Sequence, residues 1–284
     1  MPELPEVEVL VRHLEPLLRN KRIRKVVVNR ERVLRPTRVK ELTEKLAGAR
    51  FIKVERRAKF LKFSLRRAGE RQEFTLVGHL GMTGRMYLLP VKATLPKHAA
   101  VVLDLDRERF VFEDTRYFGR LTLDTTGLEG LGPEPLGEEF TPKQFGAALK
   151  RSGQPIKVKL LDQRLVAGVG NIYASEALFR AGISPRRAAS RLSTPQVLRL
   201  WKSIREVLTE AIQFGSTVAL NYGGTRARDR LFYYGSAPES KNSYEERLRV
   251  YDREGKPCVT CRSGIRKMVQ AARSTFFCPK CQGR

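Results

Sequence analysis

All four cysteines of the chain lie near its C-terminal end, at Cys258, Cys261, Cys278 and Cys281. They form two Cys-x2-Cys pairs, and 16 residues separate the pairs. Each pair forms a tight turn, and two such turns at this separation can direct four thiolates toward one metal ion, as in a tetrahedral zinc site. Paired disulfides are the alternative, but no secretory signal accompanies these cysteines. We therefore expect a small β-hairpin module with one Zn2+ ion. Its role is expected to be structural, because four thiolates leave no open coordination position.

The chain is strongly basic. Its 284 residues include 55 Lys and Arg against 30 Asp and Glu, which gives a formal net charge of +25. Such a chain usually binds a polyanion, and nucleic acid is the first candidate. An anionic membrane surface is the second, but there is no basic amphipathic helix, no lipidation motif and no apolar run of ~18–20 residues. Residues 256–284 contain basic residues and no acid, so we expect the cysteine module to face phosphates.

Apolar periodicity divides the chain into a β-rich first part and a helical second part. A helical stripe predicts a helix over 3–19, with its last turn distorted at Pro16. The stripe consists of Leu4, Val7, Val11, Leu14 and Leu18. Short β-like runs follow at 23–28, 51–54, 60–65, 74–80, 85–89, 100–105, 109–113 and 120–123. About eight short strands predict a β-sandwich or a barrel.

The composition changes at 127–142, where Gly and Pro dominate, and we place a domain boundary there. Helical patterns follow at 141–151, 155–164, 170–181 and 193–214, and a long loop follows at 221–244. A glycine-rich turn separates the second and third of these helices. We predict that Asn171 is the N-cap of the third helix and that free N–H groups at its start bind phosphate. Lys157 and Lys159 add positive charge nearby.

Three separated motifs identify a family only when they are taken together. They are the start "PELPEVE" with Lys59 in "RRAKFL", the turn "GVGNIYASE", and the four-cysteine module. "HLGMTGRM", "DTRYFGR" and "LGPEP" lie between them in order. In combination they resemble the formamidopyrimidine-DNA glycosylases, the Fpg/MutM type of the Fpg/Nei family, over nearly the whole chain.

The resemblance implies an α+β fold with two domains. It implies an N-terminal catalytic β-sandwich with a leading helix, and a C-terminal helical domain with a helix-two-turn-helix motif and a four-cysteine zinc-finger β-hairpin. We accordingly expect a sandwich domain at 1–132, a linker at 133–140 and a helical DNA-binding domain at 141–222. A lesion-recognition loop is expected at 223–244 and the zinc finger at 245–284.

The resemblance also implies a chemistry for the N-terminus. Removal of Met1 would free the amine of Pro2 as the nucleophile. A terminal amine has a pKa near 8 against about 10.4 for lysine, so far more of it is unprotonated at neutral pH. Attack on C1′ of a damaged nucleoside gives an iminium, and β,δ-elimination then cuts the strand. The implied enzyme is a bifunctional DNA glycosylase and AP lyase that excises oxidised purines, including 8-oxoguanine and formamidopyrimidines, from duplex DNA.

The family roles transfer to particular positions of this sequence. The implied catalytic set is Pro2, Glu3, Lys59 and Arg273, with Glu6, Glu134 and Glu176 as secondary acids. The implied wedge that fills the gap left by a flipped base is Met82, Arg116 and Phe118. The implied DNA contacts are His79, His98, Arg116, Lys157, Asn171, Tyr173 and Arg273. The implied partner is damaged double-stranded DNA, and we expect a monomer in a reducing, bacterial-type cytoplasm.

The sequence departs from the family pattern in two places. Tyr117 stands where a second basic residue is usual, and Ala219-Leu220 replace a basic position at the start of a lesion-recognition loop that is longer than usual. An endonuclease VIII-like enzyme for oxidised pyrimidines is the nearest alternative, although its relatives usually begin with a glycine where Leu4 stands. A non-catalytic zinc-finger DNA-binding protein and a zinc-ribbon RNA-binding protein are further alternatives, but neither requires Pro2, Glu3 and Lys59 together.

Overall fold

The computed structural model describes residues 2–215 and 248–283, and the lesion-recognition loop expected at 223–244 lies outside them. These residues divide into two compact units. The first unit contains Pro2, 6–129 and Gly215. The second contains 3–5, 130–214 and 248–283, so the N-terminal segment contributes to both.

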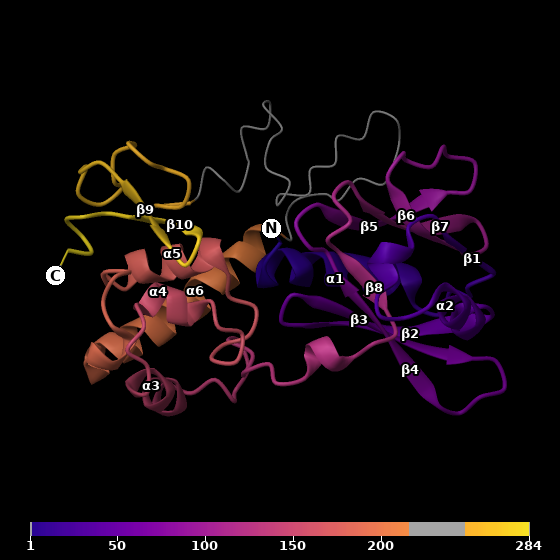
Figure 1. Cartoon of the computed structure of the whole chain (residues 1–284), viewed down its shortest axis with the longest axis horizontal. Helices are drawn as coiled ribbons and strands as arrows, with labels where there is room; N and C mark the ends of the chain where they lie inside the picture. Colours follow the sequence, from indigo (N-terminus) through magenta and orange to yellow (C-terminus); the bar gives the residue numbers. More distant parts are fainter. Residues whose placement is uncertain (1, 216–247, 284) are drawn as a thin grey trace. The chain divides into compact units, whose positions relative to one another are not determined.

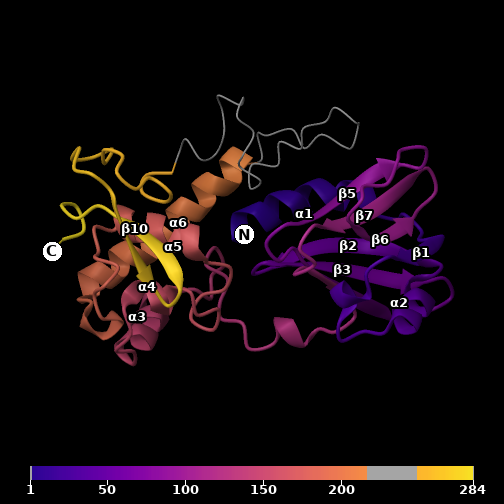
Figure 2. The same ribbon diagram turned by 45° about the horizontal axis from the view of Figure 1, so that its top comes forward.

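Two antiparallel four-stranded sheets make up most of the first unit, and they lie in two layers (Figure 2). One sheet has the order β2-β3-β4-β8, with bounds Ala49–Arg57, Phe60–Arg67, Glu73–His79 and Arg120–Thr122. The other has the order β1-β6-β7-β5, with bounds Lys25–Val28, Ala99–Asp104, Glu108–Asp114 and Gly84–Pro90. All eight expected strands are present, and they form a sandwich rather than a closed barrel.

The core of the first unit lies between the sheets and under helix α1, Leu4–Leu18. The Phe63 ring meets those of Phe51 and Phe110 edge-on, at centroid distances of 5.9 and 5.7 Å. Four residues of the predicted helical stripe, Val7, Val11, Leu14 and Leu18, are buried in this core. The fifth, Leu4, is also buried but belongs to the second unit. Helix α2, Val39–Leu46, and the 3-10 helix η1, Glu31–Leu34, were not predicted, because each has only two buried apolar residues and so shows little periodicity.

Helices dominate the second unit. They are α3 (Pro142–Lys150), α4 (Ile156–Leu160), α5 (Asn171–Arg180) and α6 (Thr194–Gly215). All four predicted helices are present, although α4 is shorter than expected because the chain turns irregularly after Leu160. The indole N–H of Trp201 in α6 donates to the carbonyl of Phe140 at 2.6 Å, which joins α6 to the segment before α3.

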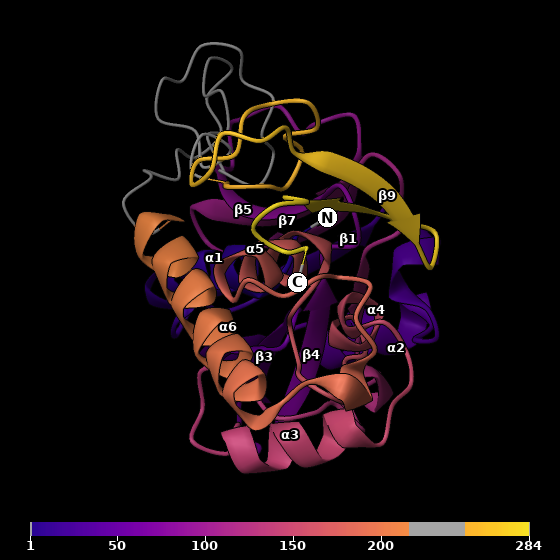
Figure 3. The same cartoon turned by 90° about the vertical axis from the view of Figure 1, so that its left-hand side faces the viewer.

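A two-stranded hairpin, β9 (Arg266–Gln270) and β10 (Arg273–Phe277), packs on α5 (Figures 1 and 3). Phe179 of α5 and Phe276 of β10 share a small apolar cluster with Val250 and Ile265. The hairpin and α5 therefore share apolar packing within the second unit. Among the described residues, the helices lack the combination of length and apolarity needed to cross a membrane.

Candidate active site and nucleic-acid interface

The carboxylate of Glu3 binds the N-terminus of α5. Its Oε2 accepts from the N–H of Gly170 at 2.8 Å and of Tyr173 at 3.4 Å, and its Oε1 accepts from Ile172 N–H at 2.9 Å. Glu3 is only 1% exposed. Unpaired N–H groups and the helix dipole favour an anion at this position. The prediction that these N–H groups bind phosphate was therefore wrong, because the chain supplies its own carboxylate to them.

Two glycines allow this contact. A Cβ on Gly170 would lie 2.3 Å from Cδ of Glu3, so any side chain there would displace the carboxylate. Gly168 has a φ of +84°, and a Cβ on it would lie 2.7 Å from that of Leu4. The carbonyl of Gly168 accepts from the N–H of Leu4 at 3.1 Å. The glycine-rich turn thus exists to receive residues 3 and 4 at close range.

Asn171 does not cap α5. The N-cap is Gly170, and Asn171 is the first helical residue. Its side-chain oxygen accepts from Nζ of Lys157, and its Nδ2 donates to the carbonyl of Ser274 at 2.8 Å. Asn171 therefore links α4 to β10, and the N-cap prediction was wrong because Glu3 already satisfies the helix N–H groups.

Lys157 is fully buried, and burial lowers its pKa to about 8. The negative Glu3 partly opposes this decrease, and the positive Arg273 adds to it. Arg273 itself is exposed at the start of β10. The hairpin therefore presents a cation near the buried Lys157 and its partner Asn171.

Glu176 of α5 holds the backbone of residues 249–251. Its carboxylate accepts from the N–H groups of Arg249, Val250 and Tyr251 at 2.8–2.9 Å. Burial raises its pKa, while the three N–H groups oppose that increase. Tyr173, three residues earlier on α5, is also buried, at 1% exposure.

Glu134 lies half-buried in the segment before α3. Arg205 of α6 anchors that segment, because its guanidinium donates to the carbonyls of Pro135 and Gly137 at 2.8 and 3.0 Å.

Lys59 lies in the tight β2–β3 turn of the first unit. The turn includes Ala58 at a φ of +53°, and Lys59 is 9% exposed. Arg56 donates to the carbonyl of Ala58 at 3.2 Å and to the carboxylate of Glu8 at 2.8 Å. The ion pair ties the turn to α1, the helix that begins just after Pro2. Glu6, on the same helix, is 2% exposed.

The proposed wedge residues lie on two adjacent loops of the first unit. Met82 and Phe118 are 40% and 43% exposed, so both apolar side chains are accessible at the surface of this unit. The buried carboxylate of Asp114 joins the loops. It accepts from the hydroxyl of Thr83, and from the backbone N–H groups of Arg116 at 3.1 Å and Gly119 at 2.7 Å. Sequence reasoning missed Asp114, whose only signal was an acid at the end of a strand.

Arginines surround the second of these loops. The guanidinium carbons of Arg116 and Arg32 lie 4.8 and 5.8 Å from the centroid of the Phe118 ring. Tyr117 has a φ of +54°, and its hydroxyl lies 3.2 Å from both Nε of Arg30 and Nδ1 of His98. The departure from the family pattern at Tyr117 therefore positions an exposed arginine, Arg30.

His79 lies in the first unit at the end of β4. Burial, with help from the positive Lys59 and Arg120, lowers the pKa of His79 to about 4. Its Nδ1 accepts from the N–H of Gly81 at 3.2 Å. His79 is therefore neutral at physiological pH, with Nε2 as its N–H donor.

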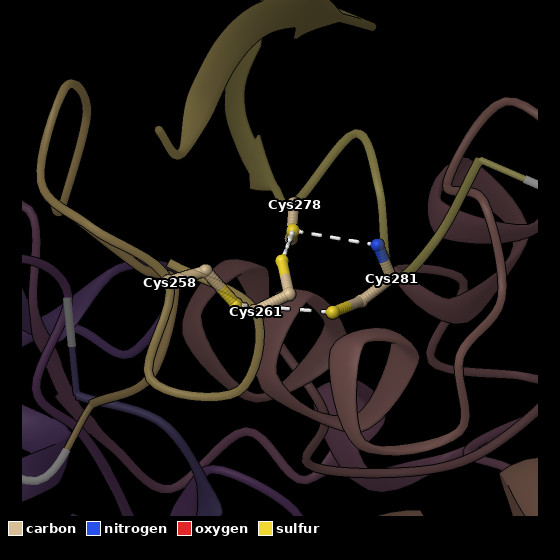
Figure 4. Close-up of side chains that lie close together, drawn as sticks. All are labelled: Cys258, Cys261, Cys278 and Cys281. Atoms are coloured by element: carbon tan, nitrogen blue, oxygen red, sulfur yellow. Dashed lines mark hydrogen bonds between the residues drawn. The ribbon is translucent and has the colours of Figure 1, made fainter. Parts of the chain in front are cut away.

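The four cysteines converge in the second unit (Figure 4). Their sulfur atoms all lie within 4.8 Å of one another, with Cys258 to Cys281 at 3.9 Å and Cys261 to Cys278 at 3.4 Å. Zn–S bonds of about 2.3 Å in a tetrahedron place sulfurs roughly 3.8 Å apart, so the cluster fits one zinc ion. All four thiols are free of disulfides. The expected zinc module is thereby confirmed.

The two units each collect part of the predicted residue set. The second unit brings together Glu3, Lys157, Asn171, Tyr173, Glu176 and Arg273 around α5. The first contains Pro2, Glu6, Lys59, His79, Met82, His98, Arg116 and Phe118.

Models of three known domains match the chain in order. Residues 1–121 match the formamidopyrimidine-DNA glycosylase N-terminal domain, and 131–221 match the formamidopyrimidine-DNA glycosylase H2TH domain. Residues 255–283 match a zinc finger found in FPG and IleRS.

Full-length relatives and solved structures agree with these matches. Formamidopyrimidine-DNA glycosylases of Carboxydothermus hydrogenoformans and Thermus thermophilus are 38% and 42% identical, and each alignment covers at least 99% of both chains. Lactococcus lactis Fpg bound non-covalently to DNA containing an AP site has a TM-score of 0.84 at 31% identity, covering 99% of this chain and 100% of that one. MutM in complex with DNA containing carbocyclic 8-oxo-G has a TM-score of 0.85 at 32% identity, with both chains fully covered. The chain therefore belongs to the formamidopyrimidine-DNA glycosylase family.

Proposed function

We propose that this protein is a bifunctional DNA glycosylase and AP lyase of base excision repair, with oxidised purines in duplex DNA as its substrates. The observation that carries the proposal is the carboxylate of Glu3, buried and bound by the first N–H groups of α5, immediately beside Pro2. Removal of Met1 makes the amine of Pro2 the N-terminus, so Glu3 then lies next to a free amine. An acid with a purely structural role would not need to occupy that position.

The chemistry begins with the secondary amine of Pro2. Its lone pair forms a bond to C1′ of the damaged nucleoside, and the C1′–N bond to the base breaks with protonation of the leaving base. The attached nitrogen then loses its proton, and Glu3 gives a proton to O4′ as the C1′–O4′ bond breaks, which opens the sugar ring and leaves an iminium between Pro2 and C1′. Loss of a 2′ proton then expels the 3′ phosphate, and a second elimination expels the 5′ phosphate.

A base stacked in a duplex is out of reach of this amine, so the nucleotide is flipped out at a cost of a few kcal/mol. Met82 and Phe118 fill the space that it leaves, and Arg116 contacts the orphan base. Their exposure and the anchoring of both loops by Asp114 support this role. Lys59 is assigned to the phosphate beside the lesion.

Backbone contacts come from both units. Arg273, Lys157, Asn171 and Tyr173 are assigned to phosphates on the second unit, and His79 and His98 to those on the first. The four thiolates would hold one zinc ion, which would supply structural support to the β9–β10 hairpin and so to Arg273. The bacterial relatives and the unpaired, metal-binding cysteines support a cytoplasmic enzyme that acts on chromosomal DNA.

Borohydride trapping tests the proposal, because borohydride reduces the iminium to a stable covalent complex. Wild-type protein and a Pro2→Gly variant are incubated with three duplexes. These contain 8-oxoguanine opposite cytosine, thymine glycol, or an abasic site.

We expect efficient trapping of the wild-type protein on the 8-oxoguanine duplex and strongly reduced trapping of the Pro2→Gly variant. Preferential trapping on thymine glycol would refute the purine assignment. Absence of trapping on every duplex, in protein shown by mass spectrometry to lack Met1, would refute the enzyme itself.

A further inference from the structure

Gln163 lies in the turn between α4 and α5, and sequence reasoning assigned it no role. Both the amide nitrogen and the amide oxygen of its side chain form hydrogen bonds. Its Nε2 donates to the carbonyls of Leu161 at 3.0 Å and Val169 at 2.8 Å, while its Oε1 accepts from the N–H of Gly168 at 2.9 Å. The amide thus closes the glycine-rich turn on itself.

One of these hydrogen bonds leads directly to Glu3. The carbonyl of Val169 and the N–H of Gly170 belong to the same peptide group. That group accepts from Gln163 at its oxygen and donates to Glu3 Oε2, at 2.8 Å in both cases. Donation to a peptide oxygen polarises the peptide and strengthens donation by its N–H. Gln163 is therefore one peptide group away from the carboxylate.

A second connection runs through Gly168. Gln163 accepts from the N–H of Gly168, whose carbonyl accepts from the N–H of Leu4 at 3.1 Å. The backbone of Gln163 is itself fixed, because its carbonyl accepts from the N–H of Gly132 at 2.8 Å. Residues 3 and 4 are thus both held by groups that Gln163 orients.

We propose that Gln163 is a positioning residue for base excision, which orients the Val169–Gly170 peptide against Glu3 and so holds the carboxylate beside Pro2. The proposal rests on the function proposed above for Glu3. It assigns a role to the side-chain N–H donors of Gln163 rather than to its bulk.

Two variants of similar size distinguish a role for the N–H donors of Gln163 from a role for its volume. Gln163→Glu keeps the shape and the acceptor but replaces the donors with a carboxylate that faces two carbonyls. Gln163→Met keeps only the approximate shape. Gln154→Glu is the matched control, because Gln154 is exposed in the same unit and its side chain has no hydrogen bond among the described residues. Each protein is assayed for single-turnover excision of 8-oxoguanine between pH 6 and 8.5, for affinity towards an abasic-analogue duplex, and for thermal melting.

We expect Gln163→Glu to slow single-turnover excision by roughly 10–100-fold, as removal of a supporting hydrogen-bond partner typically does, with DNA affinity nearly unchanged. Relative to wild type, its rate should recover as the pH falls, because the protonated carboxyl donates to Val169 again. The relative rate of Gln163→Met should stay low at every pH.

A rate for Gln163→Glu equal to that of the Gln154→Glu control would overturn the proposal. Equal, pH-independent losses in both Gln163 variants, matched by losses of DNA affinity and melting temperature, would also overturn it in favour of a purely structural role. Failure of the proposed function is distinguishable, since wild-type protein would then not excise the base.

Discussion

Substitution of Gly170 by alanine tests how closely Glu3 must approach α5. The added Cβ would lie 2.3 Å from Cδ of Glu3 and 2.4 and 2.7 Å from its two carboxylate oxygens. Non-bonded carbons rest about 3.5 Å apart, so the carboxylate would have to move by roughly 3.5 − 2.3 = 1.2 Å. That displacement breaks hydrogen bonds that now measure 2.8 and 2.9 Å.

A misplacement of about 1 Å at a catalytic group costs on the order of 10²-fold in rate. We therefore expect Gly170→Ala to reduce single-turnover excision of 8-oxoguanine by about 10²-fold, equivalent to about 2.7 kcal/mol of barrier. The effect should appear in the excision rate rather than in zinc content or in DNA affinity, because the cysteine cluster and the exposed cations are unchanged.

Gly153→Ala is the matched control. It lies in the same unit, and a Cβ there would meet nothing within 4 Å. Pre-steady-state quench-flow with excess enzyme measures both variants on the same duplex, and borohydride trapping reports the iminium independently. If Gly170→Ala excises at the rate of Gly153→Ala, the buried carboxylate does not act from the position seen here.

Four further predictions concern folding stability and metal binding. Ala272, at the hairpin tip, has a φ of +56°, a conformation that costs an L-residue about 1 kcal/mol. Ala272→Gly should therefore raise the unfolding free energy of zinc-loaded protein by about 1 kcal/mol. Ala147→Gly, on the exposed face of α3, should lower it by about 1 kcal/mol in the same melting experiment, and the reasoning fails if both move in one direction. The pKa of Lys157 is depressed to about 8 from an ordinary value near 10.5, so the unfolded chain binds the proton more tightly. The free energy of unfolding of the wild type should therefore rise with pH between about 8 and 10.5 because of this residue. Urea titrations should show a smaller rise with pH for Lys157→Met, and an equal rise in both proteins would contradict the prediction. Chelation of zinc should melt the hairpin and abolish DNA binding while the near-UV signal of the sandwich aromatics persists, and full cleavage by zinc-free protein would count against this.

The zinc module, the eight strands and the main helices could all be predicted from the sequence. The cysteine spacing is local, and the period of apolar residues reports directly which face of a strand or helix is buried. The two missed elements, α2 and η1, are short and have few buried apolar residues, so they leave little periodic pattern. The family resemblance implied catalytic roles for Glu3 and Lys59, but it could not say what holds them in place.

Only the tertiary structure decided the partners of those residues. Glu3 meets Gly170 across 167 positions of sequence, and Asp114 binds Thr83 across 31. No local pattern encodes such contacts, because they depend on where separately formed elements come together. For the same reason the N–H groups of α5, which sequence alone predicted as a phosphate site, are occupied by a carboxylate. A helix terminus attracts any anion, and the fold decides which one arrives.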